Sequence, residues 1–161
     1  FSTSFISSII FFIPIAIFFI LNLGSFTCSF LNNNIIISSP VISGPKVYEL
    51  INLLKEKQMS GVQITIVTWM PDSYGFGDAA YWMQLHEDMR KAGFYIKTVE
   101  EYCDRFAVID QEVVWYGNIN LLAKDKIDNS IMRVMSKDIA GELMEITFGD
   151  NDREVRCNVN D

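Results

Sequence analysis

The sequence predicts an α/β fold: a mixed β-sheet flanked by helices on both faces and preceded by a hydrophobic N-terminal segment. Two observations predict it. Short β-branched runs alternate with stretches of helical periodicity between residues 32 and 93, and strand-like runs then cluster between residues 94 and 135. The chain has 161 residues, which suits one ordinary domain. It opens on Phe1 rather than Met, which predicts a fragment or a processed product.

The first 31 residues form the hydrophobic segment, and no charged residue occurs before Lys46. The stretch 5–23 has about the length of a minimal membrane-spanning helix. The first lysines follow it, so the positive-inside rule places the next domain in the cytoplasm, anchored to a membrane. A packed core helix and a non-native sequence at a fragment's edge are the alternatives for this segment.

A domain over residues 32–149 is expected to begin with alternating strands and helices. The run "IIISSP" at 35–40 is typical of a buried strand that ends in a turn. Pro45 suits the first turn of a helix that ends at Gly61. The apolar positions of this helix are Val47, Leu50, Ile51 and Leu54. The run "VQITIVTW" at 62–69 predicts the second strand.

The second half of this domain is expected to contain more strands. After a loop at 70–77, Asp78 caps a helix that runs to about Ala92. Strands are predicted at 94–99, 105–110, 112–117 and 130–135, and Ser136 caps a last helix that ends near Phe148. Residues 150–161 form a polar tail. Ligands of such sheets bind beyond the carboxyl ends of the strands. The polar residues expected at strand ends are Ser38, Ser39, Thr68 and Asp110.

Composition narrows the class of function. Thirteen basic and twenty acidic residues give a net charge of −7, which argues against broad nucleic-acid binding by phosphate neutralisation. Cys28, Cys103 and Cys157 contain no CxxC pair, so neither a zinc knuckle nor a disulfide framework is expected. The thiols are predicted to be reduced, structural groups of a cytosolic domain.

The stretch from Cys103 to Asn120 holds the polar residues that suggest a binding site. Arg105 and Asn120 are donors, Asp110 is an acceptor, and Gly117 allows close backbone approach. A guanidinium and amide donors match the oxygens of a phosphate group. From the residues alone, a hairpin whose polar ends satisfy its turns explains the same pattern.

From about residue 34 to 148 the chain resembles one half of the phospholipase D superfamily, in the subgroup of domains attached to helicases and nucleases. The resemblance rests on "IIISSPVIS", "GVQITIVTWMPDSY" and "WYGNINLL" followed by "NSIMR". The family motif is HxKxxxxD, six residues, then GSxN. The matching positions here are Cys103, Arg105 and Asp110, then six residues, then Gly117, Asn118 and Asn120.

The resemblance implies a phosphodiesterase, a hydrolase in which the motif His attacks phosphorus and a second motif His protonates the leaving oxygen. The Lys, Ser and Asn clamp the phosphate oxygens, and the Asp supports the geometry. It implies no metal and no other cofactor. Two half-sites are needed, which here implies a homodimer. The implied partner is a nucleic-acid or phospholipid phosphodiester, within a helicase or nuclease context in the full-length protein.

Carried over residue by residue, the resemblance gives two sets of site residues. The catalytic positions are Cys103, Arg105 and Asp110, and the phosphate-binding positions are Arg105, Asn118 and Asn120. The sequence departs from the family where the chemistry lies, because Cys replaces the nucleophilic His, Arg replaces Lys and Asn118 replaces Ser. Asn129 also stands where the subgroup commonly carries Glu. His86, the only histidine, is predicted to be a solvent-exposed residue of the second helix.

These departures predict a pseudoenzyme, a catalytically degenerate phospholipase D-like domain that retains phosphate, phosphodiester or partner binding. One alternative is an active phosphodiesterase, nuclease or phospholipase that works through a composite dimer site. A membrane-anchored interaction module is the other. In the expected dimer, Trp115 and Tyr116 supply apolar burial.

Overall fold

The computed structural model describes residues 34–75, 77–100, 103–118, 120–123 and 130–149. All of these belong to one compact unit, Asn32–Asp161. The hydrophobic segment at 5–23, the polar tail at 150–161 and Asn129 lie outside the described residues. Within the described ranges, no helix is long and apolar enough to span a bilayer.

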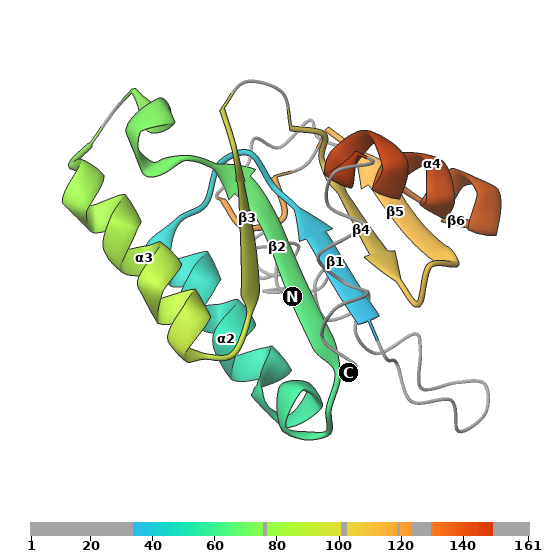
Figure 1. Ribbon diagram of the computed structural model, residues 1–161, viewed down its shortest axis with the longest axis horizontal. Coiled ribbons are helices and arrows are strands. Elements are labelled where there is room, and N and C mark those ends of the chain that lie inside the picture. Colours follow the sequence, from blue (N-terminus) through green and yellow to red (C-terminus); the bar gives the residue numbers. More distant parts are fainter. Residues whose placement is uncertain (1–33, 76, 101–102, 119, 124–129, 150–161) are drawn as a thin grey trace, which may run out of the picture. The chain divides into compact units, whose positions relative to one another are not determined.

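The centre of the fold is a mixed six-stranded sheet with the strand order β3-β2-β1-β4-β5-β6 (Figure 1). β1, β2 and β3 run parallel, whereas β4, β5 and β6 pair antiparallel. The strands are β1 (Asn34–Ser38), β2 (Gln63–Trp69), β3 (Tyr95–Val99), β4 (Phe106–Ile109), β5 (Val113–Gly117) and β6 (Ile131–Met135). Every strand that the sequence predicts is present, within one or two residues at each end.

Three α-helices, α2 (Gly44–Met59), α3 (Ala79–Lys91) and α4 (Lys137–Phe148), match the predicted ones. Asp78 caps α3 by accepting from the backbone N–H of Ala80 at 3.0 Å, and Ser136 caps α4 by accepting from Ile139 at 3.3 Å. The predicted loop at 70–77 contains a short 3₁₀ turn, η2 (Pro71–Tyr74). Proline at its start, with φ already set for a helical turn, favours this turn.

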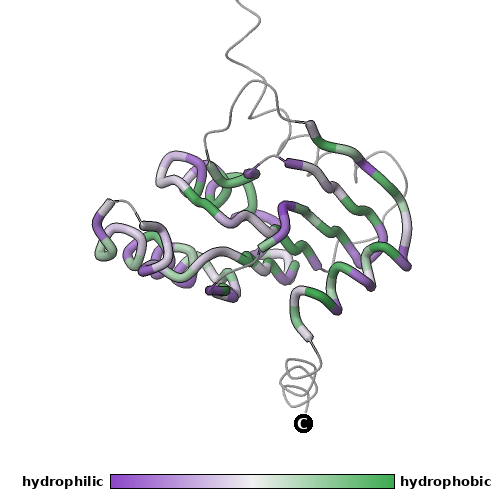
Figure 2. The backbone as a smooth tube through the Cα atoms, turned by 90° about the horizontal axis from the view of Figure 1, so that it is seen from above, coloured by the Kyte–Doolittle hydropathy of each residue, from purple (hydrophilic) through white to green (hydrophobic). Residues whose placement is uncertain are grey.

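The helices cover both faces of the sheet. On one face the core residues of the strands pack against Ala140 and Leu143 of α4. These strand residues are Ile36, Val67, Phe106, Val108 and Val114. The strand residues that alternate with these, such as Ile37 and Ile66, are equally buried. They face the side of α2 and α3, because successive side chains of a strand point to opposite faces of the sheet. In Figure 2 hydrophobic and hydrophilic colours alternate along α4, as its amphipathic role requires.

The antiparallel pairing decides which loops meet at each edge of the sheet. Phe106 at the start of β4 lies opposite Ser38 at the end of β1, and Gly117 at the end of β5 lies opposite Ile131 at the start of β6. The β4–β5 turn is therefore at the other edge. Asp110 directly follows the end of β4, as predicted, and occupies that turn with a φ of 53°, so it lies at the edge opposite the carboxyl ends of β1 and β2. A turn between antiparallel strands returns the chain to the edge where β1 begins.

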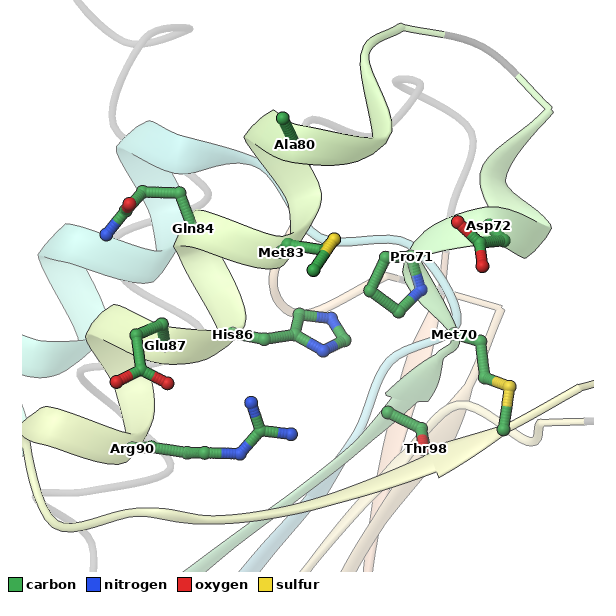
Figure 3. Close-up of a pocket in the computed structure, with 10 residues that line it drawn as sticks. All are labelled: Met70, Pro71, Asp72, Ala80, Met83, Gln84, His86, Glu87, Arg90 and Thr98. Carbon is green, nitrogen blue, oxygen red and sulfur yellow. The ribbon is translucent and has the colours of Figure 1, made fainter.

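His86 is also placed differently from the prediction. Its side chain is 1% exposed and lies on the buried side of α3, between the helix and the ends of β2 and β3 (Figure 3). Trp82, Leu85 and Met89 share that buried side. Spacings of three and four residues put His86 on the same stripe, so the apolar periodicity of α3 contained the signal for its burial.

Candidate functional site

The predicted site residues other than Asp110 gather at the carboxyl edge of β1. The chain brings Cys103 and Arg105 there just before β4 begins, while Asn118 and Asn120 follow the end of β5. The backbone ties the two sides together, because Gly117 N–H donates to the carbonyl oxygen of Arg105 at 3.3 Å. Two loops thus converge where ligands bind in sheets of this kind.

Arg105 and Asn120 contact each other directly. The Nε–H of Arg105 donates to Oδ1 of Asn120 at 3.0 Å. The terminal nitrogens of Arg105 bind no described residue, so the planar end of the guanidinium keeps its donors for a ligand. A guanidinium held at Nε in this way presents two parallel N–H donors, the geometry that binds a phosphate or carboxylate.

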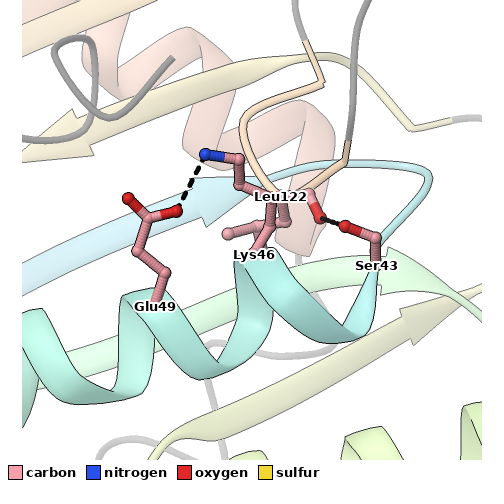
Figure 4. Close-up of polar contacts among 4 residues, drawn as sticks. All are labelled: Ser43, Lys46, Glu49 and Leu122. Carbon is pink, nitrogen blue, oxygen red and sulfur yellow. Dashed lines mark hydrogen bonds and ion pairs between the residues drawn. The ribbon is translucent and has the colours of Figure 1, made fainter. Parts of the chain in front are cut away.

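The loop that carries Asn120 is anchored to the start of α2. The backbone N–H of Leu122 donates to Ser39 Oγ at 3.3 Å, and its carbonyl accepts from the backbone N–H of Ser43 at 2.7 Å. The Ser43 hydroxyl also donates to that carbonyl, at 3.4 Å, beside the ion pair between Lys46 and Glu49 (Figure 4). These bonds fix Asn120, and through it the orientation of Arg105.

Gly117 is required by the close approach of β6. A Cβ atom at this position would lie 2.1 Å from the carbonyl oxygen of Ser130, a distance that no side chain tolerates. Asn118 closes the same junction, because its Oδ1 accepts from the backbone N–H of Ser130 at 2.7 Å. The amide nitrogen of Asn118 is left pointing away from that bond, available as a donor at an exposed position.

Cys103 stands on the α4 face of the sheet, where its sulfur lies 3.2 Å from Ser38 Oγ. The Ser38 hydroxyl donates to the carbonyl oxygen of Asp104 at 2.5 Å. Its one proton is committed there, so the serine oxygen accepts from the thiol, which must be protonated to donate. Burial has the largest effect on the pKa of the Cys103 thiol and raises it; the hydrogen bond with Ser38 lowers this pKa, the negative charge of Asp104 raises it, and the charge of Arg105 lowers it, so that the net shift is upward. Neutral thiol, a weak nucleophile, is the form that the site favours.

A cavity of about 100 Å³ adjoins the Cys103 thiol. Its walls are Ser38, Val67, Val99, Asp104, Ile146 and Thr147. The motif that the sequence resembles has an imidazole at this position, and the thiol of Cys103 is smaller than that ring. Sequence reasoning placed Ser38 at a strand end but missed its contact with the thiol. The strand-end position in "IIISS" was the available signal.

Asp110 does not join this group. Its Oδ1 accepts from the backbone N–H of Asn34 at 3.2 Å, and its own N–H donates to the carbonyl oxygen of Asn34 at 2.9 Å. The residue therefore links the β4–β5 turn to the start of β1. This placement gives Asp110 contacts that support the sheet, and no contact with Cys103 or Arg105 is among them.

Comparisons with known proteins identify a fold and no closer relationship. The sequence matches no protein-family profile and no curated protein. A crystal structure of polyphosphate kinase from Porphyromonas gingivalis is similar, with a TM-score of 0.56 and 16% sequence identity. The similarity covers 81% of this chain and 26% of that protein, so this chain spans about a quarter of its length. The likeness supports a phospholipase D-like fold.

Proposed function

We propose that this chain is a catalytically degenerate phospholipase D-like domain that binds the phosphate group of a ligand at Arg105. The observation that carries the proposal is the bond from Arg105 Nε to Asn120 Oδ1 at 3.0 Å. It orients a guanidinium whose terminal donors bind no described residue. Motif spacing and contact geometry therefore agree on the same pair of side chains.

The donors around Arg105 suit a phosphate rather than a larger apolar ligand. The guanidinium supplies the positive charge and two parallel N–H groups. Asn118, fixed by its bond to Ser130, supplies a neutral donor at the same edge of the sheet. The similar solved structure is named a polyphosphate kinase, which makes chains of phosphate the natural first probe for this chain.

Loss of turnover follows from what stands at the nucleophile position. An in-line attack on phosphorus needs a deprotonated or basic group, and burial keeps the Cys103 thiol protonated. The only imidazole of the chain belongs to His86, which lies on the other face of the sheet, beside α3. Neither the nucleophile nor the proton donor of the family mechanism is supplied at the motif.

A homodimer remains part of the proposal, because one motif per chain supplies half of a composite site. Tyr116 is 41% exposed on β5, next to the site, and would contribute apolar area at an isologous interface. Trp115 contributes less to such a surface than expected, because it is only partly exposed and lies within 6.0 Å of the Arg133 guanidinium. Sedimentation at tens of micromolar tests this part; a monomer there refutes the composite site.

Thermal protection by tripolyphosphate and by inorganic phosphate tests the binding proposal on the 161-residue chain. Both should raise Tm, tripolyphosphate more, and Arg105→Ala should abolish the shift. Lys91→Ala is the matched control, since Lys91 is an exposed cation of α3 paired with Glu87. Equal protection of the wild type and the Arg105 variant would refute binding at this site.

Hydrolysis assays test the degeneracy. The chain should not cleave bis(p-nitrophenyl) phosphate or single-stranded DNA above background. The triple variant Cys103→His, Arg105→Lys, Asn118→Ser should regain metal-independent cleavage, because in a homodimer both imidazoles of the family mechanism would return in one step. Turnover by the wild type that disappears in Cys103→Ala would show an active enzyme instead.

A further inference from the structure

A second cavity lies away from the motif, on the opposite face of the sheet. It has a volume of about 620 Å³ and lies between α3, the turn η2 and the end of β3 (Figure 3). Met70, Pro71 and Met83 give it apolar walls. Thr98 lines this cavity, while its neighbour Val99 lines the small cavity at Cys103.

His86 is the unexplained group of this cavity. Its side chain is 99% buried, yet Nε2 has no hydrogen-bond partner among the described residues. A buried polar atom without a partner costs about 1–3 kcal/mol, and such atoms are rare in folded proteins. In Figure 3 the ring points from α3 into the cavity, towards Pro71 and Thr98. A ligand in the cavity would supply the missing partner.

Arg90 supplies the positive charge beside it. One helical turn after His86, its guanidinium extends into the same space (Figure 3). Arg90 forms no ion pair with a described residue, whereas its neighbour Glu87 is 3.9 Å from Lys91. The cation and the imidazole thus face one volume from the same side of α3, a geometry that suits an oxyanion bound between them.

We propose that this cavity binds a small organic acid, a carboxylate or a phosphate monoester with a compact apolar body. The acidic head lies between Arg90 and His86 Nε2, and the apolar body contacts Met70, Pro71 and Met83. Asp72 lies at the other end of the cavity from Arg90 (Figure 3), which sets the direction of the ligand. This site is distinct from that at Arg105 and does not rest on the function proposed there.

Binding at this site is coupled to the protonation of His86. Without a ligand, burial and the positive charge of Arg90 lower the pKa of His86 to about 4. The charged groups around the cavity are Arg90 and Glu87 of α3 and Asp72 of η2. An anionic head offsets the charge of Arg90 and accepts a bond from the ring, so it raises the pKa of His86, and affinity increases as the pH falls.

Ring resonances of the single histidine give a direct readout, since no other residue contributes to them. We would titrate the 161-residue chain with benzoate, phenyl phosphate, inorganic phosphate and the neutral benzyl alcohol. At least one of the two aromatic acids should shift the His86 signals saturably and raise the ring pKa. The acid that binds more tightly, benzoate or phenyl phosphate, shows whether the site prefers a carboxylate or a phosphate group. Inorganic phosphate and benzyl alcohol should bind at least tenfold more weakly than that acid.

Variants separate this site from the motif site. Arg90→Gln should weaken the aromatic acid at least tenfold, and Arg90→Lys should recover part of the affinity by restoring the charge. Lys91→Gln and Arg105→Ala should leave it unchanged. The proposal is overturned if benzyl alcohol binds as tightly as the acids, if Arg90→Gln binds normally, or if none of the probes moves the histidine signals.

Discussion

Two adjacent residues at the end of β3 line two different cavities. Val99 faces the small cavity under α4, where Cys103 lies, and Thr98 faces the large cavity beside α3, where His86 lies. The first cavity adjoins Cys103, which stands at the nucleophile position of the motif that the sequence resembles. The second carries no motif and holds the only imidazole of the chain. Motif spacing and burial therefore single out two different places in the fold, one at Cys103 and Arg105 and the other at the unsatisfied Nε2 of His86.

Burial shifts the pKa values of Cys103 and His86 in opposite directions, and both shifts favour the neutral form of the side chain. It raises the pKa of the Cys103 thiol and lowers that of the His86 imidazole, because a buried site favours the neutral form of either. At neutral pH neither group is charged, and the charge of an arginine acts on each of them. The charge available for ligand binding is therefore that of Arg105 on one side and Arg90 on the other.

The largest loss of stability should come from adding a side chain at Gly117, the last residue of β5. A methyl group there meets the carbonyl oxygen of Ser130 at 2.1 Å, so Gly117→Ala should lower the free energy of unfolding by about 3 kcal/mol. Gly141→Ala is the matched control, because a Cβ at Gly141 in α4 meets nothing within 4 Å. That variant should be more stable by about 0.5–1 kcal/mol. Denaturant unfolding measures both, and equal stability of the two variants would contradict the close approach of β6.

Acid should lower the stability of the fold through protonation of His86 in α3. The imidazole has a pKa of about 4 in the folded chain against 6.5 as the ordinary value, so the unfolded chain binds the extra proton first. The contribution is present above pH 6.5 and is lost as the pH falls towards 4. It should reach about 2 kcal/mol, below the full value for such a shift because the cavity opens to solvent. His86→Gln should show a smaller loss of stability between pH 6.5 and 4.5; identical pH profiles would disprove this role.

Replacing the helix caps of α3 and α4 should have a smaller effect on stability. Asp78 caps α3 and Ser136 caps α4, so replacing either with Ala should cost about 1 kcal/mol of stability. Asp78→Ala should cost slightly more at low salt, because a carboxylate also interacts with the positive end of the helix dipole. Thermal unfolding at two salt concentrations measures the difference. Identical salt dependence of the two variants would argue against a dipole contribution.

Thiol reactivity gives the smallest effect, and its sign is informative. The charge of Asp104 raises the pKa of Cys103 and that of Arg105 lowers it. At pH 7.5, Asp104→Asn should therefore speed alkylation of Cys103 about twofold to fivefold, and Arg105→Ala should slow it by a similar factor. Mass spectrometry of the Cys103 peptide measures the rates, with Cys28 and Cys157 as internal references. A change of the same sign in both variants would exclude electrostatic control.

Local patterns predicted most of the fold, because each element follows from nearby residues. The buried run at 35–37 predicts β1, and the caps at Asp78 and Ser136 mark two helix starts. The position of Asp110 could not be read in this way, since it depends on which edge of the sheet a β-turn reaches. The lowered pKa of His86 depends first on burial by walls that η2 and β3 supply and then on Arg90 of the same helix, and the contacts with η2 and β3 cross 12 or more residues of sequence.

At the candidate site, the motif spacing predicted that Arg105 and Asn120 would converge, although 15 residues separate them. It did not predict that the thiol of Cys103 would turn towards Ser38 and α4. That orientation depends on packing against α4, whose contact with the sheet has no counterpart in the spacing of the motif. Patterns along the chain thus locate ligand-binding donors better than they locate the surroundings of a buried group.

The bond between Asp110 and Asn34 has a consequence for the order of folding. The β4–β5 hairpin closes over the three residues 110–112, with positive φ at Asp110 and Gln111, so it forms from local contacts at a small cost in loop entropy. β1 must reach it across about 70 residues and is the slower partner. Two hydrogen bonds between Asp110 and Asn34, the first residue of β1, fix the register of this strand when it pairs. Asp110 therefore aligns an incoming strand, a role that does not depend on phosphate chemistry.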